Sequence, residues 1–440
     1  MGVTRQDITL TAQQVKQAQA GEASKRIEPH PKAVVVLAGG RDSYQLPLAL
    51  DEGGLLDTLV TDLYWPADKR WFSALSSSLV PRKILSARYC SKLDGSRVLL
   101  SKRALVASTL SHIAPRLNLN RYKDRAVSKR GGRVALRHHA ALFCCNYYAS
   151  EAFKHKDALK YRFLFQLQAD FQATRRILLE EIERTPIAKA SLSATYELSL
   201  SDKELEELCN EPSLANGWVT TSSFAARTLA ERGLPAEQIH VVPYGVDTDT
   251  FAERARPPDS KEPFKIIYVG SLIQRKGLSY LLDAMRMVKS RNVRLTLCTR
   301  GLIDEQLLAE YADLDIEIKI GLSGRSLANE LHTSDVFVFP SLAEGFALVI
   351  LETMSCGVPV ITTSHTCAPD VMVDGEHGFI VPIRDAEAIA EKLTWGIEHR
   401  ADLAAMGEAA AARARHFTWE RFREGIRAAY AEMIDSAVTA

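Results

Sequence analysis

The feature that most constrains the fold is an alternation of short apolar runs with longer stretches of helical spacing. The run at 33–38 is rich in valine and is closed by Gly39 and Gly40. A run of this length that is apolar at every position predicts a strand buried on both faces, as in a parallel sheet covered by helices. Comparable runs occur at 142–145, 162–166, 217–221, 264–269, 293–299, 315–320, 335–339 and 358–363. Strands that alternate with helices in this way predict doubly wound α/β domains.

A charged segment with three prolines, residues 253–263, divides the alternation and predicts a linker. We therefore expect two Rossmann-like doubly wound domains that face a cleft. The expected parts are a polar extension at 1–31, a first domain at 32–255, a second domain at 263–400 and Ala-rich helices at 401–440. Between strands of the first domain, we expect a helix at 97–111 and a loop near Gly131 and Gly132.

The net charge hides a strongly basic segment. The chain has 55 Lys and Arg against 54 Asp and Glu, which by itself argues against an anionic partner. Residues 82–137, however, hold 15 of the cations and only two acids, Asp94 and Asp124, so the rest has 40 cations against 52 acids. Leucines and Tyr122 interleave the basic residues, as in a helix that lies on an anionic bilayer. A solvated basic face and a site for an acidic glycan remain open alternatives, and no nucleic-acid partner is expected.

The cysteines and the termini indicate a cytoplasmic protein. Seven cysteines, an odd number without C-x-x-C spacing, predict buried reduced thiols. The first residues are polar rather than typical of a secretory signal. No apolar run approaches the roughly 20 residues that span a bilayer. We expect a cytoplasmic location, with a peripheral position at the inner membrane face as an open alternative through the basic segment.

The segment 339–359 carries the clearest functional signal. A strand ends at Pro340, a loop holds Glu344 and Gly345, and an apolar helix then contains Glu352. A buried carboxylate needs a partner, so Glu352 is expected either to pair with a neighbouring arginine or to accept hydrogen bonds from ligand hydroxyls. Free backbone N–H groups at a helix start bind anions. Those of Phe346, Ala347 and Leu348 therefore predict a phosphate site, and with Glu352 they fit a nucleotide sugar.

Two further loops follow strands. After the strand at 264–269 come Gly270 and Ser271, and then Arg275 and Lys276 directly before a helix that begins at Gly277. Cations at a helix start oppose its dipole unless an anion lies between them, so this loop predicts a diphosphate site, with solvated surface cations as the alternative. The Gly39-Gly40 turn allows close approach of the backbone to a ligand. It lies at a strand end, where such sites form.

These residues carry a resemblance to a known family. The matching stretches are the E-x7-E pattern of Glu344 and Glu352, the loop from Gly270 to Gly277, the segment 242–247 with Phe251, the lead-in 335–341, and the closing segment 417–420 with Tyr430. Together they resemble the family 4 glycosyltransferases, which are retaining enzymes with the GT-B fold. The match is strong over about 205–435 and weak over 1–200.

The resemblance implies a retaining hexosyltransferase that moves a sugar from a nucleotide-diphosphate sugar to a glycan, lipid-linked or small-molecule acceptor. It implies no essential metal, no cofactor beyond the donor substrate, and C-terminal helices at 401–440 that pack back on the first domain. Glu344 would lie by the donor sugar, and Lys276 with Arg275 would neutralise the diphosphate. The implied binding residues are Gly39, Gly40, Gly270, Ser271, Arg275, Lys276, Gly345, Phe346, Ala347, Leu348 and Glu352.

Two departures from the family pattern stand out. Ser271 occupies the place after the loop glycine where the family usually has arginine, and Arg275 is expected to supply that charge. The family often has a histidine at the end of a first-domain strand, where this chain has glutamines, Gln166 and Gln168. The pair His138-His139 is expected to belong to the basic surface instead.

Other readings of the sequence remain open. Asp247 with Asp249, and Asp313 with Asp315, have the D-x-D spacing of metal-dependent glycosyltransferases, but their contexts predict turn or capping roles. The chain could instead bind nucleotide sugars without catalysis, or epimerise them on the same scaffold. A dinucleotide oxidoreductase is disfavoured because no G-x-G-x-x-G fingerprint is present.

Overall fold

The computed structural model describes residues 30–65, 88–113, 119–253, 262–290 and 292–439. The expected N-terminal extension, residues 82–87 and 114–118 of the basic segment, and most of the expected linker at 253–263 lie outside the described residues. Among the helices that are described, none is long and apolar enough to cross a bilayer.

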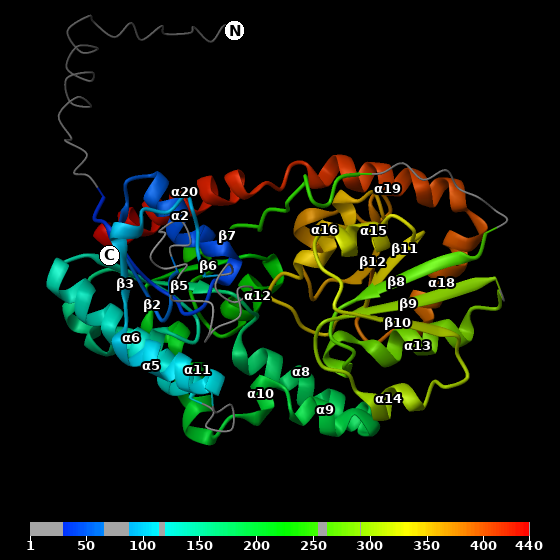
Figure 1. The fold of residues 1–440 in the computed structure, drawn as a ribbon, viewed down its shortest axis with the longest axis horizontal. Helices are drawn as coiled ribbons and strands as arrows, with labels where there is room; N and C mark the ends of the chain where they lie inside the picture. The colour runs from blue at the N-terminus through cyan, green and yellow to red at the C-terminus, as the bar shows by residue number, and fades with distance from the viewer. Residues whose placement is uncertain (1–29, 66–87, 114–118, 254–261, 291, 440) are drawn as a thin grey trace, which may run out of the picture. The chain divides into compact units, whose positions relative to one another are not determined.

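The first sheet is parallel and has seven strands in the order β3-β2-β1-β4-β5-β6-β7 (Figure 1). They are β1 (Ala33–Val36), β2 (Leu56–Thr61), β3 (Val98–Leu100), β4 (Ala141–Cys145), β5 (Arg162–Gln166), β6 (Gly217–Thr220) and β7 (Ile239–Val241). Its helices are α2 (Gln45–Glu52), α5 (Lys102–Ile113), α6 (Asn120–His138), α7 (Ala149–Ala152), α8 (Phe171–Arg184), α9 (Lys189–Ser193), α10 (Tyr196–Ser199), α11 (Asp202–Leu214) and α12 (Ser223–Glu231).

The second sheet is also parallel and has six strands in the order β10-β9-β8-β11-β12-β13. They are β8 (Phe264–Val269), β9 (Val293–Thr299), β10 (Ile316–Ile320), β11 (Val336–Phe339), β12 (Val360–Thr363) and β13 (Gly378–Val381). Its helices are α13 (Leu278–Met287), α14 (Glu305–Ala309), α15 (Arg325–Leu331), α16 (Leu348–Ser355), α17 (Ala368–Val371), α18 (Ala386–Glu398) and α19 (Arg400–Ala414).

The central strands are buried on both faces, as their apolar sequences predict. Every residue of β1, β4, β6, β11 and β12 is buried. Chain order reverses between β1 and β4 in the first sheet, and between β8 and β11 in the second. Loops at the carboxyl ends of such neighbouring strands diverge and leave room for a ligand. The predicted pair of doubly wound α/β units is confirmed.

The last helix returns to the first sheet. Helix α20 (Trp419–Thr439) packs along α2, and Arg423 Nε donates to Glu52 Oε2 at 2.8 Å. Tyr430 is fully buried, with its ring centroid 6.3 Å from Phe143 and 5.6 Å from Phe163. Helix α19 differs from the expectation for 401–440, because it packs against α16 and α18 of the second sheet. Only the final helix crosses back.

The loop expected at Gly131 and Gly132 is wrong, because both residues lie inside α6. A Cβ at Gly131 would stand 2.2 Å from Val36 Cγ2, and one at Gly132 would stand 2.6 Å from the carbonyl oxygen of Ala152. The two glycines therefore let α6 approach β1 and α7 closely. Helix propensity alone disfavours glycine in this position, but packing against the sheet outweighs that preference.

Candidate functional site

A pocket of about 360 Å³ opens at the carboxyl ends of β8, β9, β10 and β11, at the switch point of the second sheet. Several residues predicted from sequence line it together: Gly270, Ser271, Lys276, Glu344, Ala347 and Glu352. Thr299, Arg300 and Gly301 after β9, and Leu322, Ser323 and Gly324 after β10, complete the wall. The pocket therefore joins the Glu344–Glu352 element to the Lys276 loop, as the nucleotide-sugar hypothesis requires.

Lys276 and Glu344 form a buried ion pair in this pocket. Glu344 is only 7% exposed, and Ser341 Oγ donates a second hydrogen bond to its Oε1 at 2.6 Å. Burial by itself favours the neutral carboxyl, but Lys276 and Arg275 outweigh it and hold the pKa of Glu344 below its usual value. Glu344 is therefore ionised, and the Lys276 ammonium also lies 5.6 Å from the centroid of the Phe339 ring.

Glu352 lies one turn into α16, and its carboxylate forms no hydrogen bond or ion pair with any residue that the structure describes. Burial raises the pKa of this carboxyl to about 7, and the nearby Arg300 offsets only part of the effect. The alternative of a structural salt bridge is thus not realised. A half-buried carboxylate with free acceptor oxygens at the pocket wall is suited to bind ligand hydroxyls.

The raised pKa of Glu352 predicts a pH-dependent stability. The folded protein holds this proton up to about pH 7, whereas the unfolded chain releases it near 4.5. The stabilisation is therefore complete below pH 4.5 and is lost as pH rises to about 7. We expect Glu352→Gln to be more stable than the wild type at pH 8, by on the order of 1 kcal/mol given its partial exposure, and to match it at pH 4.5. Urea unfolding at the two pH values checks this, and an equal effect at both would contradict it.

The start of α16 has free backbone donors. Ala347 lines the pocket, whereas Phe346 and Leu348, also predicted for the site, lie outside its lining. The N–H groups of Phe346, Ala347 and Leu348 make no hydrogen bond within the described part of the chain. Ala347 precedes the helix with φ 73°, a left-handed conformation that costs energy for a residue with a side chain. Strain of this kind clusters at ligand sites. The predicted anion site at this helix start thus has its donors free.

Arg300 is a pocket residue that the sequence analysis missed. It follows β9, is exposed, lines the pocket, and forms no ion pair with a described residue. Its loop is joined to the Ser271 loop, because Leu272 N donates to Leu302 O and Asp304 N donates to Leu272 O, each at 2.8 Å. The only sequence signal was a lone arginine after a buried strand, which becomes informative once β9 is known to lie beside β8.

Arg275 does not enter this pocket. Its guanidinium Nη1 donates to Glu197 Oε1 at 2.7 Å, and Nη2 lies 3.4 Å from Gln168 Oε1. Both partners belong to the first-sheet half, so Arg275 ties the two halves together. Gln168, one of the two glutamines that the sequence analysis singled out at the end of this strand, is therefore engaged by a residue of the second half.

Gly345 lies at the same seam rather than in the pocket wall. Ser222 Oγ donates to its carbonyl oxygen at 2.6 Å. A Cβ at Gly345 would stand 1.8 Å from the carbonyl oxygen of Leu167. The ring centroid of Phe346 lies 5.2 Å from that of Tyr244. Gly345 is needed here because the loop touches the first-sheet half backbone to backbone.

The Gly39-Gly40 turn stands at the switch point of the first sheet, outside the pocket lining. Gly39 has φ 84°, and its N–H donates to Asp62 Oδ1 at 2.8 Å. Three non-glycine residues after the turn, Asp42, Ser43 and Tyr44, are also left-handed. Tyr244 OH donates to the carboxylate of Asp42. Tertiary contacts thus hold a strained loop at the position predicted for the first-domain side of the site.

The aspartates with D-x-D spacing have structural roles. Asp247 Oδ1 accepts from the backbone N–H groups of Asp249 and Thr250 at 3.1 Å each, which closes a turn. Asp313 pairs with Arg286 on the surface. No cluster of three or more His, Cys, Asp or Glu residues suited to a metal occurs in the described ranges.

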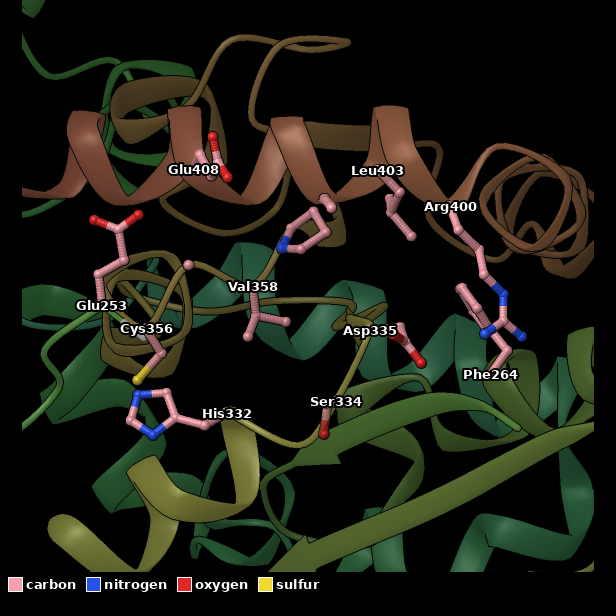
Figure 2. A pocket seen from close by; sticks show the side chains of 13 residues that line it. Glu253, Phe264, His332, Ser334, Asp335, Cys356, Val358, Arg400, Leu403 and Glu408 are labelled. Atoms are coloured by element: carbon pink, nitrogen blue, oxygen red, sulfur yellow. The ribbon is translucent and has the colours of Figure 1, made fainter. Parts of the chain in front are cut away.

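A second, smaller cavity of about 60 Å³ lies at the opposite edge of the second sheet. Figure 2 shows it beneath α19, with Glu253, His332 and Cys356 on one side and Arg400 with Phe264 on the other. Phe264 and Asp335 stand at or next to the amino ends of β8 and β11. The cavity therefore sits at the edge opposite the strand ends where α/β sheets bind ligands, and we assign it no role in the site.

Comparison with known proteins bears on the second half of the chain. Residues 249–413 match the family model described as "Glycosyl transferases group 1". The chain is 29% identical over 174 residues to the amylovoran biosynthesis glycosyltransferase AmsK of Erwinia amylovora, covering 37% of this chain and 42% of that protein. It is 32% identical over 222 residues to the MMP alpha-(1->4)-mannosyltransferase of Mycolicibacterium hassiacum, covering 49% and 53%. The chain thus spans about half the length of the curated relatives it matches.

Solved structures extend the likeness to both halves. Sucrose-phosphate synthase from Thermosynechococcus elongatus superposes with a TM-score of 0.62 at 18% identity, covering 93% of this chain and 100% of that one. Anabaena HepE in complex with UDP gives a TM-score of 0.58 at 16% identity, covering 92% and 100%. At such identities the likeness concerns the fold, and it supports the two-unit α/β architecture.

Proposed function

We propose that this chain, whose residues 249–413 form a glycosyltransferase group 1 domain, transfers a sugar from a nucleotide-diphosphate sugar to an acceptor hydroxyl. The observation that carries the proposal is the pocket at the β8–β11 switch point. It combines a free carboxylate at Glu352, a cation at Arg300, the Lys276–Glu344 pair and unengaged amides at the start of α16. A carboxylate suits a ribose diol, and cations with amides suit a diphosphate. Anabaena HepE, a structural neighbour, has been solved in complex with UDP and with UDP-glucose.

The proposed chemistry concentrates on the leaving group. Negative charge grows on the diphosphate as its bond to the anomeric carbon breaks, and preorganised donors aimed at that charge are the largest expected catalytic contribution. In this proposal Lys276, Arg300 and the α16 amides supply these donors. Glu344 is held by Lys276 and Ser341, which favours an electrostatic role beside the donor sugar over attack on it. We propose transfer with retention of configuration and without a metal.

The proposal also covers the acceptor and the cellular location of the protein. A glycan, a lipid-linked sugar or a small molecule would enter from the first-sheet side, near the Gly39-Gly40 turn and the end of β5.

All seven cysteines are free thiols, six of them buried, which supports the proposed cytoplasmic location. The similarity to AmsK, a glycosyltransferase of amylovoran biosynthesis, supports a polysaccharide precursor as one acceptor to test.

The test is a product assay with a panel of UDP-, GDP- and ADP-sugars and a glycan or lipid extract as acceptor. We expect one donor to release its nucleoside diphosphate and to yield a product whose anomeric configuration, read by NMR, equals that of the donor. Mass spectrometry identifies the acceptor. Inverted configuration would overturn retention, an isomerised nucleotide sugar without transfer would indicate an epimerase, and binding without turnover would indicate a binding protein.

Arg300 gives a sharper prediction about the diphosphate. Lys276 is already paired with Glu344, so Arg300 is the lining cation without an acidic partner among the described residues. We expect Arg300→Ala to weaken the binding of the nucleoside diphosphate about 10- to 100-fold, the usual cost of losing a charge-assisted hydrogen bond. Binding of the matching nucleoside, which has no phosphate, should change little.

The matched control is Arg294→Ala. Arg294 is exposed near the start of β9, the strand that Arg300 follows, and it lies outside the pocket. Calorimetric titration of both variants with both ligands separates the possibilities. An equal loss for the nucleoside and the diphosphate would place Arg300 at the base or ribose instead. Unchanged diphosphate affinity would remove it from the site.

A further inference from the structure

The helices α5 and α6 form a basic surface on the outer side of the first sheet. None of the residues that line it also lines the donor pocket. They lie side by side in Figure 1. Between them runs a groove of about 560 Å³. Six cations and one acid line this groove: Lys102, Arg103, Arg125, Lys129, Arg130, Arg133 and Glu151. The structure therefore concentrates the charge of the basic segment onto one face.

Most of these cations have no ion-pair partner among the residues that the structure describes. Arg125 pairs with Glu207 at 2.6 Å, and Glu151 pairs with Lys154 outside the groove lining, also at 2.6 Å. The other five groove cations form no ion pair with a described residue, and the Nε of Arg130 is buried without a hydrogen-bond partner. Like charges brought together without counter-charges repel one another. An anion in the groove would relieve that repulsion.

Apolar side chains are exposed on the same helix pair. Val106 is 58% exposed, Leu110 is 42% exposed and Tyr122 is 52% exposed. Arg103, Val106 and Leu110 follow the spacing i, i+3, i+7 and therefore share one face of α5. Tyr122 lines the groove at the start of α6. Exposed aliphatic groups beside cations suit insertion into a lipid surface, whereas a soluble acidic glycan offers nothing to cover them.

We propose that this α5–α6 surface docks the protein on a bilayer of anionic phospholipid. In this arrangement Lys129, Arg133 and their neighbours bind headgroup phosphates, while Val106, Leu110 and Tyr122 enter the boundary between headgroups and acyl chains. Tyrosine suits that boundary because it has an apolar ring and a polar hydroxyl. The surface lies on the half that bears the proposed acceptor side, so docking would hold the protein beside acceptors carried in the membrane. The proposal rests on α5 and α6 alone and stands independently of the donor pocket.

The test is co-sedimentation of the full-length protein with vesicles of pure phosphatidylcholine or with 30% phosphatidylglycerol added, at low and high salt. We expect binding to the anionic vesicles only, falling as salt rises. The double variant Lys129→Glu/Arg133→Glu should bind at least tenfold more weakly. Its control is Lys289→Glu/Arg294→Glu, which makes the same change in net charge at exposed positions beside the second sheet and should bind like the wild type.

Two further measurements complete the test. Val106→Ser/Leu110→Ser should reduce the binding that persists at high salt, and circular dichroism should show that each variant folds. Absence of wild-type binding to anionic vesicles at low salt would overturn the proposal. So would equal losses in the two charge-reversal variants, or tight binding of a soluble polyanionic glycan with no binding to vesicles. Donor binding measured on the same variants should be unchanged, which separates failure here from failure of the proposed activity.

Discussion

Replacing Lys276 with alanine is expected to lower turnover about 10²- to 10³-fold, the usual cost of removing one preorganised group that stabilises developing charge. The reason is its position. Its ammonium lies in the pocket wall beside the start of α16 and is fixed there by Glu344 and Phe339. A flexible surface lysine would gain little from the same charge, because solvent screens it. Steady-state release of nucleoside diphosphate measures the effect.

Loss of Lys276 also leaves Glu344 as a buried carboxylate without its nearest cation, so stability must be separated from catalysis. Breaking a buried ion pair by removing one partner typically costs 3–5 kcal/mol. The double variant Lys276→Ala/Glu344→Gln removes the orphaned charge, and we expect it to recover much of the stability but none of the activity. Lys265→Ala is the matched control, since that lysine pairs with Glu262 at the surface. If the double variant regained activity, Lys276 would have only a structural role.

Substituting Gly345 with alanine is expected to be as damaging, through geometry rather than charge. The new Cβ would stand 1.8 Å from the carbonyl oxygen of Leu167 and 2.9 Å from Cα of Gln168, so one backbone segment must move. Forced shifts of this kind cost about 1–3 kcal/mol or more. Because Glu344 is the preceding residue, its displacement should also lower turnover, by about 10²-fold for a shift near 1 Å. Thermal unfolding and the turnover assay measure the two effects.

Gly95→Ala provides the control for that prediction. No heavy atom lies within 4 Å of a Cβ built at Gly95, and its φ is outside the positive region. We expect this variant to unfold at the wild-type temperature and to keep full activity. A Gly345→Ala protein with unchanged stability and turnover would show that the contact between the loop and the first-sheet half is dispensable.

The fold follows from the sequence because its strongest signal, fully apolar runs between helices, depends on burial alone. The strand at 33–38 and those of the second half fall where expected. β2 was not predicted, since its sequence mixes Asp57 and Thr58 with apolar residues. The helix expected at 97–111 is wrong in its first turn, because residues 98–100 form the short strand β3 and the helix begins only at Lys102. Gly131 and Gly132 gave the wrong local prediction, because their reason for being glycine lies in β1 and α7.

The candidate site likewise contains residues that the sequence predicts and residues that it does not. Glu344, Glu352 and Lys276 come from loops that follow adjacent strands, so sheet topology brings them together. Arg275 was predicted beside Lys276 because the two are neighbours in sequence, yet consecutive residues point in different directions, and Arg275 reaches Glu197 instead. Arg300 could not be recognised, because its proximity to Ser271 depends on the pairing of β9 with β8. Gly345 was predicted to bind the ligand. Its neighbour in the structure is instead the backbone carbonyl of Leu167, which is far away in the sequence.

The central claim is that a nucleotide-diphosphate sugar binds at the β8–β11 switch point through Glu352 and the cations around it. Calorimetric titration of the wild type, Glu352→Ala and Arg294→Ala with UDP-, GDP- and ADP-sugars tests it most directly. We predict that the wild type and Arg294→Ala bind one of these donors with the same affinity, and that Glu352→Ala binds it at least tenfold more weakly. Failure of the wild type to bind any of them, or equal affinity in Glu352→Ala, would contradict the account.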